Sequence, residues 1–297
     1  MNIYLFGATT PTGQAFINLY SKDNPKDNLI CFSRNNLKYK YIDFDRSEIY
    51  LPKNNKKFII VSFAPIWKIS RFLEKLYKKN PNIFKNLLGL VICSSSSVIT
   101  KRFSFNKFDK NLFEKLLTSE NLLNQFSRKL NISICILQPT LVYGNIGEFK
   151  DKNINLIKSL MQLLPFIIIP SNSGLRQPIH AYQLASLALK KVQLIKENTN
   201  KVFSNKILIG GDQIISFDEM LCKIKTEKRG QNKIIKCFII RIPNRIYSFF
   251  VSPLILFSPK LYEAFNRLNS DLSGFTKISE ILQIPEMKFP VKNSDFI

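Results

Sequence analysis

The sequence has little that would build a disulfide or metal framework. Its 297 residues include five cysteines, none in a Cys-x-x-Cys pair, and a single histidine. Three of the cysteines lie in apolar runs expected to be strands, which is typical of buried reduced thiols rather than disulfides or zinc ligands. No apolar run approaches the ~20 residues that cross a bilayer, and the N-terminus lacks a charged-then-apolar signal pattern. These absences predict a cytoplasmic protein with no metal site.

Acidic residues are scarce as well. The chain has 21 Asp and Glu against 44 Lys and Arg, a formal net charge of +23. Such a charge raises the question of a nucleic-acid or membrane partner. However, the lysines are scattered through loops between asparagines rather than gathered on one helix. We therefore expect no nucleic-acid partner, although anionic ligands should be attracted to the protein.

The most informative segment is the first one, MNIYLFGATTPTG. A short apolar strand runs into a turn at Gly7, and an amphipathic helical pattern follows Gly13. Strand, tight turn and helix together place a pyrophosphate against unpaired N–H groups at a helix N-terminus. Thr10 stands where a glycine usually admits the phosphate, and its hydroxyl is expected to donate instead. The pattern predicts a nucleotide site; the alternative is an ordinary strand-to-helix turn. The residues expected at the site are Gly7, Thr9, Thr10, Thr12 and Gly13.

The rest of the chain alternates between apolar runs and helical stretches. NLICFS, YKYIDF, KFIIVSF, GLVICSS and SICILQP are expected strands, with helices later at about 153–164 and 182–196. This alternation predicts an α/β fold, a doubly wound parallel sheet with helices on both faces. We expect residues 1–150 to form the nucleotide-binding core, and residues 151–297 to supply the remainder of the core and a smaller C-terminal lobe.

The ordered motifs resemble the extended short-chain dehydrogenase/reductase superfamily, which includes the nucleotide-sugar epimerases and dehydratases. GATTPTG, FSR, IDFD, SFAP, SSSSV, QPTLVYG and RQPIHAYQLA occur in the family's order. The resemblance implies a Rossmann-type fold that binds a nicotinamide cofactor. A Pro-Ile-Trp segment, SSSSVITK and GLRQPIH further resemble an atypical bacterial subgroup described as NAD-dependent epimerase/dehydratase-like, which implies a role in surface-polysaccharide synthesis.

The end of the second strand indicates which cofactor is preferred. NAD-preferring sites hold the ribose with an Asp or Glu there, whereas this chain has Ser33 and Arg34. A guanidinium pairs well with a 2′-phosphate, so NADP(H) is favoured over NAD(H). A plain surface arginine is the alternative. By resemblance, the other cofactor-binding residues are Asp43, Ala64, Pro65, Pro139 and Thr140.

The family's catalytic Tyr-x-x-x-Lys pair is missing. No tyrosine occurs between Tyr77 and Tyr143, and alignment on VYG puts leucines at positions 112 and 116. Ser95 matches the serine that hydrogen-bonds the reacting oxygen. We therefore name Ser95 and Lys101 as the catalytic candidates, with a solvated loop lysine as the alternative for Lys101.

The substrate candidates lie beside the serines and in the RQPIHAY segment. By resemblance, Arg176 pairs with a sugar-nucleotide diphosphate. His180 is either a substrate contact or a packed structural histidine. The candidates are Ser97, Thr100, Arg176 and His180.

Three hypotheses of function remain open. The first is an NADP(H)-dependent oxidoreductase or epimerase acting on a nucleotide-linked sugar. The second is a non-catalytic NADP(H)-binding sensor or assembly protein, since the usual catalytic pair is absent. The third places the protein at a membrane surface through its basic charge and the apolar segment IYSFFVSPLILF. The oligomeric state, the sugar and the proton donor stay undetermined.

Overall fold

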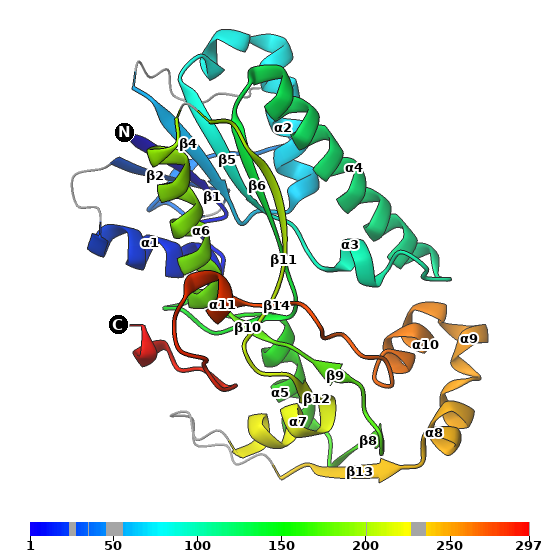
Figure 1. Ribbon diagram of the computed structural model, residues 1–297. Coiled ribbons are helices and arrows are strands. Elements are labelled where there is room, and N and C mark those ends of the chain that lie inside the picture. Colours follow the sequence, from blue (N-terminus) through cyan, green and yellow to red (C-terminus); the bar gives the residue numbers. More distant parts are fainter. Residues whose placement is uncertain (24–27, 35, 46–55, 200, 227–235, 297) are drawn as a thin grey trace.

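A parallel sheet of eight strands forms the centre of the molecule (Figure 1). The computed structural model describes residues 1–23, 28–34, 36–45, 56–199, 201–226 and 236–296. The strands follow the order β3–β2–β1–β4–β5–β6–β11–β14. Their bounds are β3 (Lys40–Tyr41), β2 (Asn28–Ser33), β1 (Asn2–Phe6), β4 (Phe58–Ser62), β5 (Leu87–Cys93), β6 (Ser133–Pro139), β11 (Ser204–Gly210) and β14 (Thr276–Lys277). Every pair in this sheet is parallel.

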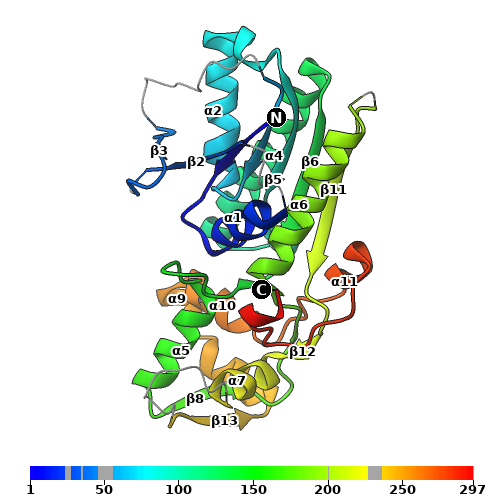
Figure 2. The ribbon, with the colours of Figure 1, turned by 90° about the vertical axis from the view of Figure 1, so that its left-hand side faces the viewer.

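The central strands β1 and β4 are apolar apart from Asn2 and Ser62, because both faces of the sheet are covered. All residues of β1 and β4 are buried, as expected for parallel strands between two helical layers. Helices α1 (Pro11–Asp23) and α6 (Ala181–Glu197) pack together over one face. Helices α2 (Ile66–Lys79) and α4 (Lys107–Leu130) cover the other (Figure 2). The doubly wound α/β fold predicted from the sequence is confirmed.

The strand order places a binding crevice at one end of the sheet. From β1 the chain runs outward to β2 and β3, then returns to the other side of β1 with β4. Ligands of open parallel sheets bind at such a reversal, outside the carboxyl ends of the strands. The glycine turn after β1 lies at this point.

A smaller lobe lies beyond the carboxyl ends of the strands (Figure 1). The core is not confined to the first half of the chain, since β11, β14 and α11 (Ile278–Leu282) extend the sheet and its helical cover. The remaining elements are η1 (Pro81–Phe84), α3 (Ser97–Thr100), β7 (Val142–Tyr143), α5 (Asn153–Leu163), β8 (Phe166–Pro170), β9 (Leu175–Arg176), β10 (Ile179–His180), β12 (Ile215–Ser216), α7 (Phe217–Thr226), β13 (Phe238–Ile242), α8 (Asn244–Val251), α9 (Leu254–Phe257), α10 (Pro259–Asn266) and η2 (Asn293–Asp295).

Two local expectations can be compared with the structure. The helices expected at 153–164 and 182–196 are α5 and α6. The strand expected at YKYIDF is wrong in length, because only Lys40 and Tyr41 pair with β2. After them the chain turns inward, and Phe44 packs 5.1 Å from Phe72 and 5.7 Å from Phe6 between ring centroids. Burial of these aromatic rings takes the place of further strand pairing.

All five cysteines are free thiols. Burial raises the pKa of Cys31, Cys93 and Cys135 to about 12. These three thiols are therefore neutral near pH 7, in agreement with the reduced, structural role expected from the sequence.

Candidate functional site

The turn after β1 requires glycine at two positions. Gly7 has φ +80°, and a Cβ on it would lie 2.6 Å from the amide nitrogen of Ala64. A Cβ on Gly13 would lie 2.2 Å from the carbonyl oxygen of Gly7. The first glycine thus lets the turn pass close to the end of β4, and the second brings the start of α1 against the turn. These are the close approaches that a phosphate-binding turn needs.

Thr10 closes the turn from inside. Its hydroxyl donates to the Gly7 carbonyl at 2.8 Å and accepts from the Gly13 amide at 3.0 Å, as a helix N-cap does. In this conformation the Thr10 proton is donated to the Gly7 carbonyl, so the predicted donation to a phosphate would require this hydroxyl to change its partner. Pro11 has no N–H at the first helical position, so the buried Thr12 offers the backbone N–H nearest the helix start that remains for an anion.

A cavity of about 340 Å³ opens beside this turn. Thr9 lines it from the turn, and Ser33 and Arg34 line it from the end of β2. Ser33 is buried and Arg34 is exposed, so the cavity has a hydroxyl on its floor and a guanidinium at its rim. Among the described residues, its lining is Thr9, Ser33, Arg34, Asn36, Glu148 and Phe149.

Three predicted cofactor residues lie at neighbouring strand ends. Asp43 is half-buried, and its carboxylate accepts from the Asp45 amide at 3.0 Å. Ala64 is buried against the glycine turn, and Pro65 is the exposed N-cap residue of α2. The crevice is thus formed by the ends of β1, β2 and β4.

The end of β6 supplies the other two predicted cofactor residues. Pro139 is the buried last residue of that strand. The Thr140 amide donates to the carbonyl of Ile209, and the Thr140 hydroxyl donates to the carbonyl of Gln177. The Thr140 side chain therefore ties the sheet to the segment between β9 and β10.

The serine cluster follows β5. Ser95 is half-buried, and its hydroxyl oxygen accepts from the Ser97 amide at 3.2 Å. Ser94 donates to the Glu120 carboxylate at 2.6 Å. Thr100 is exposed at the end of α3. Among the described residues no acceptor takes the Ser95 hydroxyl proton, so this side chain can still donate a hydrogen bond to a reacting oxygen.

Lys101 is held by a carboxylate. Its ammonium pairs with Asp109 at the start of α4, and the Lys101 side chain is only 18 % exposed. Asp109 also pairs with Arg267 and accepts from the Asn106 side-chain amide at 2.7 Å. Burial alone would raise the pKa of Asp109, but hydrogen bonds from Lys101, Asn106 and Arg267 outweigh it and hold the pKa well below its usual range. Lys101 is thus part of an ion-pair cluster, not an open cation awaiting substrate.

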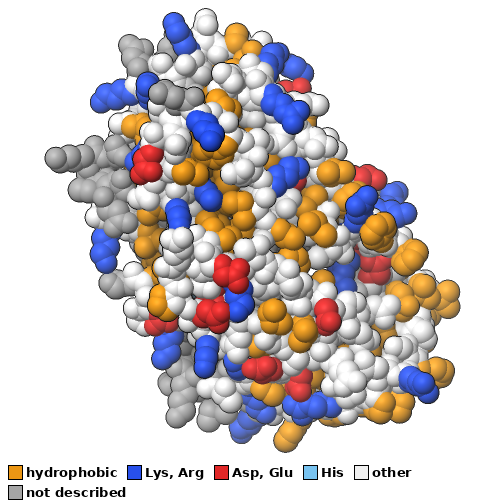
Figure 3. Space-filling view, in the orientation of Figure 1, with side chains coloured by type: hydrophobic (Ala, Val, Ile, Leu, Met, Phe, Trp, Pro, Cys, Tyr) orange, Lys and Arg blue, Asp and Glu red, His pale blue; other side chains and the backbone are white. Residues whose placement is uncertain are grey.

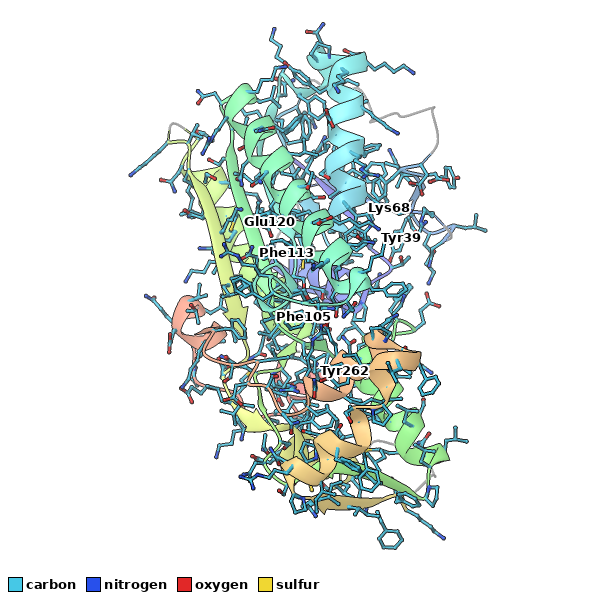
Figure 4. All side chains as sticks on the ribbon, turned by 90° about the vertical axis from the view of Figure 1, so that its right-hand side faces the viewer. Tyr39, Lys68, Phe105, Phe113, Glu120 and Tyr262 are labelled. Atoms are coloured by element: carbon cyan, nitrogen blue, oxygen red, sulfur yellow. The ribbon has the colours of Figure 1, made fainter. Side chains whose placement is uncertain are left out.

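The positions of the missing catalytic pair are filled by apolar packing. Leu116 is buried and Leu112 is half-buried against the same hydrophobic cluster. One turn farther along α4, the Glu120 carboxylate is 1 % exposed and accepts from Gln138 at 2.8 Å. Lys206 on β11 pairs with it at 2.9 Å. Figure 4 shows Glu120 midway along α4. The partners of Glu120 could not be identified from the sequence, because they come from three different strands or strand ends.

Arg176 serves the lobe internally in this structure. It is buried, and its guanidinium donates to the carbonyls of Leu175, Ser270 and Arg267. Burial lowers the pKa of Arg176 to about 10. The arginine therefore fastens β9 to the turn after α10, and the predicted diphosphate contact is not formed by these hydrogen bonds.

His180 is a packed residue at the start of α6. It is fully buried, and its Nδ1 accepts from the Tyr182 amide at 3.3 Å. Its ring stacks on Phe296 at 5.6 Å and meets Tyr143 edge-on at 5.0 Å. This environment is that of a packed structural histidine, the alternative considered for His180, and not that of a substrate contact.

The structure thus separates the predicted residues into two groups. The glycine turn, Ser33, Arg34 and Ser95 gather at the carboxyl ends of the strands. Arg176 and Thr140 instead donate to backbone carbonyls of other segments, and the His180 ring is packed among aromatic rings. The sequence analysis missed Glu263 and Arg267, because their partners lie more than 150 residues away in the chain: Arg267 pairs with Asp109, and Glu263 accepts from the Asn106 amide.

The fold is shared with enzymes of nucleotide-sugar metabolism. No protein-family model matches the chain, and no curated protein matches it. Solved structures do. The UDP-glucuronic acid 4-epimerase of Bacillus cereus, in complex with NAD, superposes with a TM-score of 0.63 at 15% identity, over 97% of this chain and 94% of that one.

Two further structures are similar. The UDP-N-acetylglucosamine 4-epimerase of Bacillus cereus has a TM-score of 0.58 at 16% identity, covering 82% of this chain and 88% of that one. The GDP-mannoheptose C4 reductase of Campylobacter jejuni, with NADP bound, has a TM-score of 0.55 at 13% identity, covering 83% of this chain and 91% of that one. At these identities the likeness establishes the fold: the chain has the Rossmann-type α/β architecture of the nucleotide-sugar epimerases and reductases, as the motifs predicted.

Proposed function

We propose that this chain is an extended short-chain dehydrogenase/reductase that binds NADP(H) and acts on a nucleotide-linked sugar as a reductase or epimerase, in surface-polysaccharide synthesis. The observation that carries the proposal is the cavity shared by the glycine turn and the end of β2. It joins an anion-binding turn to the hydroxyl of Ser33 and the guanidinium of Arg34.

The residues present fit a dinucleotide. Gly7 and Gly13 allow close backbone approaches that a Cβ would prevent, and such a tight turn presents a pyrophosphate to the N–H groups of a helix N-terminus. The end of β2 carries no carboxylate to hold a ribose 2′-hydroxyl. Arg34 instead offers charge and paired N–H donors to a 2′-phosphate. Of the described residues that line the cavity, Glu148 alone is acidic, and its charge opposes this preference.

The chain's own part in the chemistry is orientation and proton handling. A nicotinamide supplies hydride transfer when it is bound. Ser95 Oγ, which accepts from the Ser97 amide, would donate its proton in a hydrogen bond to the sugar oxygen at the reacting carbon. Lys101 would act as a positioning residue, since its ammonium is paired with Asp109. The similar structures support the substrate class, because two of them are UDP-sugar 4-epimerases and one is a GDP-sugar reductase.

A fluorescence titration with NADPH and NADH tests the cofactor assignment. Arg34→Gln removes a charge-assisted contact, worth roughly 1.5–3 kcal/mol, so NADPH affinity should fall about 10- to 100-fold with NADH affinity unchanged. Lys38→Gln, an exposed charge change four residues away, is the matched control. Glu148→Gln should tighten NADPH binding. Equal loss of both cofactors in Arg34→Gln, or an equal effect of Lys38→Gln, would refute the assignment.

Turnover with nucleotide sugars tests the catalytic residues. Ser95→Ala should abolish turnover and leave cofactor affinity unchanged. Lys101→Ala should also abolish it, whereas Lys101→Arg, which keeps a cation beside Asp109, should recover much of kcat. Full activity of both alanine variants would remove these residues from the mechanism.

A second candidate function is a non-catalytic NADP(H)-binding sensor or assembly protein. The observation that favours it is the packing of Leu112 and Leu116 into the apolar core where the family's Tyr and Lys stand. This candidate predicts the same NADPH binding but no NADPH consumption with any nucleotide sugar. Detection of turnover would exclude it.

A further inference from the structure

Two segments far apart in the sequence place large apolar side chains on the outside of the molecule. The first is the loop and helix start at residues 102–110, and the second is residues 244–265 of α8, α9 and α10. We call the surface they share the aromatic face. Its most exposed members are Phe103 (82%), Phe105 (93%), Phe108 (66%), Phe249 (75%), Phe250 (69%), Leu256 (82%) and Phe257 (84%).

The aromatic face is one surface because polar contacts hold its two halves together. The Glu263 carboxylate of α10 accepts from the Asn106 amide at 2.6 Å and from the Ser104 hydroxyl. The Lys260 ammonium lies 5.2 Å from the ring centroid of Phe108. Figure 4 shows Phe105, at the lower end of α4, next to Tyr262 of α10.

The exposed charges of the aromatic face have one sign. Its exposed ionisable side chains are Arg102, Lys107, Lys110, Arg245 and Lys260. The two segments contain only two acidic residues, Asp109 and Glu263, and both turn inward onto Arg267. Figure 3 shows apolar side chains along the right-hand edge of the molecule, over these helices, with basic side chains between them. Apolar and cationic groups are thus interleaved with no exposed negative charge.

We propose that the aromatic face docks the protein on an anionic lipid surface. Short amphipathic helices with Phe and Leu on one side and Lys or Arg around them lie in the headgroup region of such membranes, and anionic lipids attract the basic residues. A second copy of this chain is disfavoured as the occupant, because two such faces would bring cations against cations. In the described residues no helix is long and apolar enough to cross a bilayer, so the docking is peripheral.

Co-sedimentation with lipid vesicles tests the proposal without cofactor or sugar, so its outcome is independent of the proposed enzymatic function. The full chain should sediment with phosphatidylcholine vesicles containing a quarter phosphatidylglycerol and only weakly with pure phosphatidylcholine. Leu256→Ser and Phe257→Ser should each lower partitioning roughly tenfold, since each removes apolar area from the interface. Lys107→Gln and Lys260→Gln should each lower it roughly fivefold at low salt.

Matched variants separate this face from the general positive charge of the chain. Leu37→Ser removes a fully exposed leucine from the turn between β2 and β3. Lys85→Gln and Lys201→Gln remove exposed lysines at the opposite end of the sheet. These three should bind like the wild type, and all variants should keep its unfolding midpoint because the altered side chains are exposed.

Three results would overturn the proposal. The first is no sedimentation with anionic vesicles at low salt. The second is an equal loss in the control lysine variants, which would reduce the effect to overall charge. The third is a light-scattering mass of a dimer that Leu256→Ser converts to monomer, which would assign the face to a second copy.

Discussion

Replacing Asp109 by asparagine should destabilise the protein by about 2–3 kcal/mol at pH 7. The Asp109 side chain is 9% exposed and pairs with both Lys101 and Arg267, whose side chains are 18% and 27% exposed. Breaking a buried pair by removing one partner costs roughly 3–5 kcal/mol. The value here should be lower, because the two cations can regain water and asparagine still accepts one hydrogen bond.

The effect should depend on pH in a defined direction. The pKa of Asp109 is lowered in the folded state by the hydrogen bonds that outweigh its burial, so its stabilising contribution is complete above its unfolded pKa of about 3.9 and is lost as pH falls below that value. Urea unfolding of wild type and Asp109→Asn should show a constant gap between about pH 5 and 7. Below about pH 4 the gap should narrow by up to ~1.4 kcal/mol per pH unit.

A control and a refuting result complete the test. Glu74→Gln breaks an exposed i,i+4 pair with Lys78, whose side chains are 41% and 73% exposed, and it should cost less than about 0.5 kcal/mol. If the gap between wild type and Asp109→Asn stayed constant down to pH 3, the ion-pair cluster would not control the titration of this carboxylate.

Other substitutions probe the rest of the site. Gly13→Ala should lower the free energy of unfolding by more than about 2 kcal/mol and abolish cofactor binding, because its Cβ would lie 2.2 Å from the turn backbone. Gly147→Ala has open space around its Cβ and only a positive φ, so it should lower the free energy of unfolding by about 1 kcal/mol and leave cofactor binding intact. Calorimetry measures the first effect and cofactor titration the second. Glu120→Ala should lower the free energy of unfolding by about 3 kcal/mol, measured in urea, because it removes the acceptor of the buried Gln138 and the half-buried Ser94 and the partner of the exposed Lys206. In maleimide labelling of the native protein at pH 8, Cys135, buried with a raised pKa, should react far more slowly than the partly exposed Cys222; equal rates would contradict its burial.

Local patterns carried most of the fold, because parallel strands buried on both faces must be apolar throughout. The same logic failed at Phe44, which is buried without strand pairing, beyond the last hydrogen bond from the Ile42 amide to the Ser33 carbonyl. A pattern of two-residue alternation reports burial and cannot by itself report hydrogen bonding. The hydrogen-bond partners of Thr10 were unpredictable for a related reason: a threonine one residue before a helix can serve equally as an N-cap or as an outward donor.

The candidate site was less predictable because its contacts are long-range. Arg176 reaches carbonyls more than 90 residues away, at Arg267 and Ser270. The sequence pattern around an arginine is the same whether the guanidinium binds buried backbone carbonyls or faces a diphosphate. Only the geometry of the turn after α10 distinguishes them, and that turn carries no motif.

Helix α4 connects the proposed site with the aromatic face. Its first turn holds Asp109, which ties Lys101 on the serine side to Arg267 on α10. Its next turns carry Leu112 and Leu116 in place of a catalytic pair. A force that moves α10 on a membrane would therefore reach Lys101 through two ion pairs that share one carboxylate. Ser95 lies only six residues before Lys101, so Asp109→Asn should change both vesicle binding and turnover. Leu256→Ser should lower vesicle binding and leave turnover, measured without lipid, unchanged.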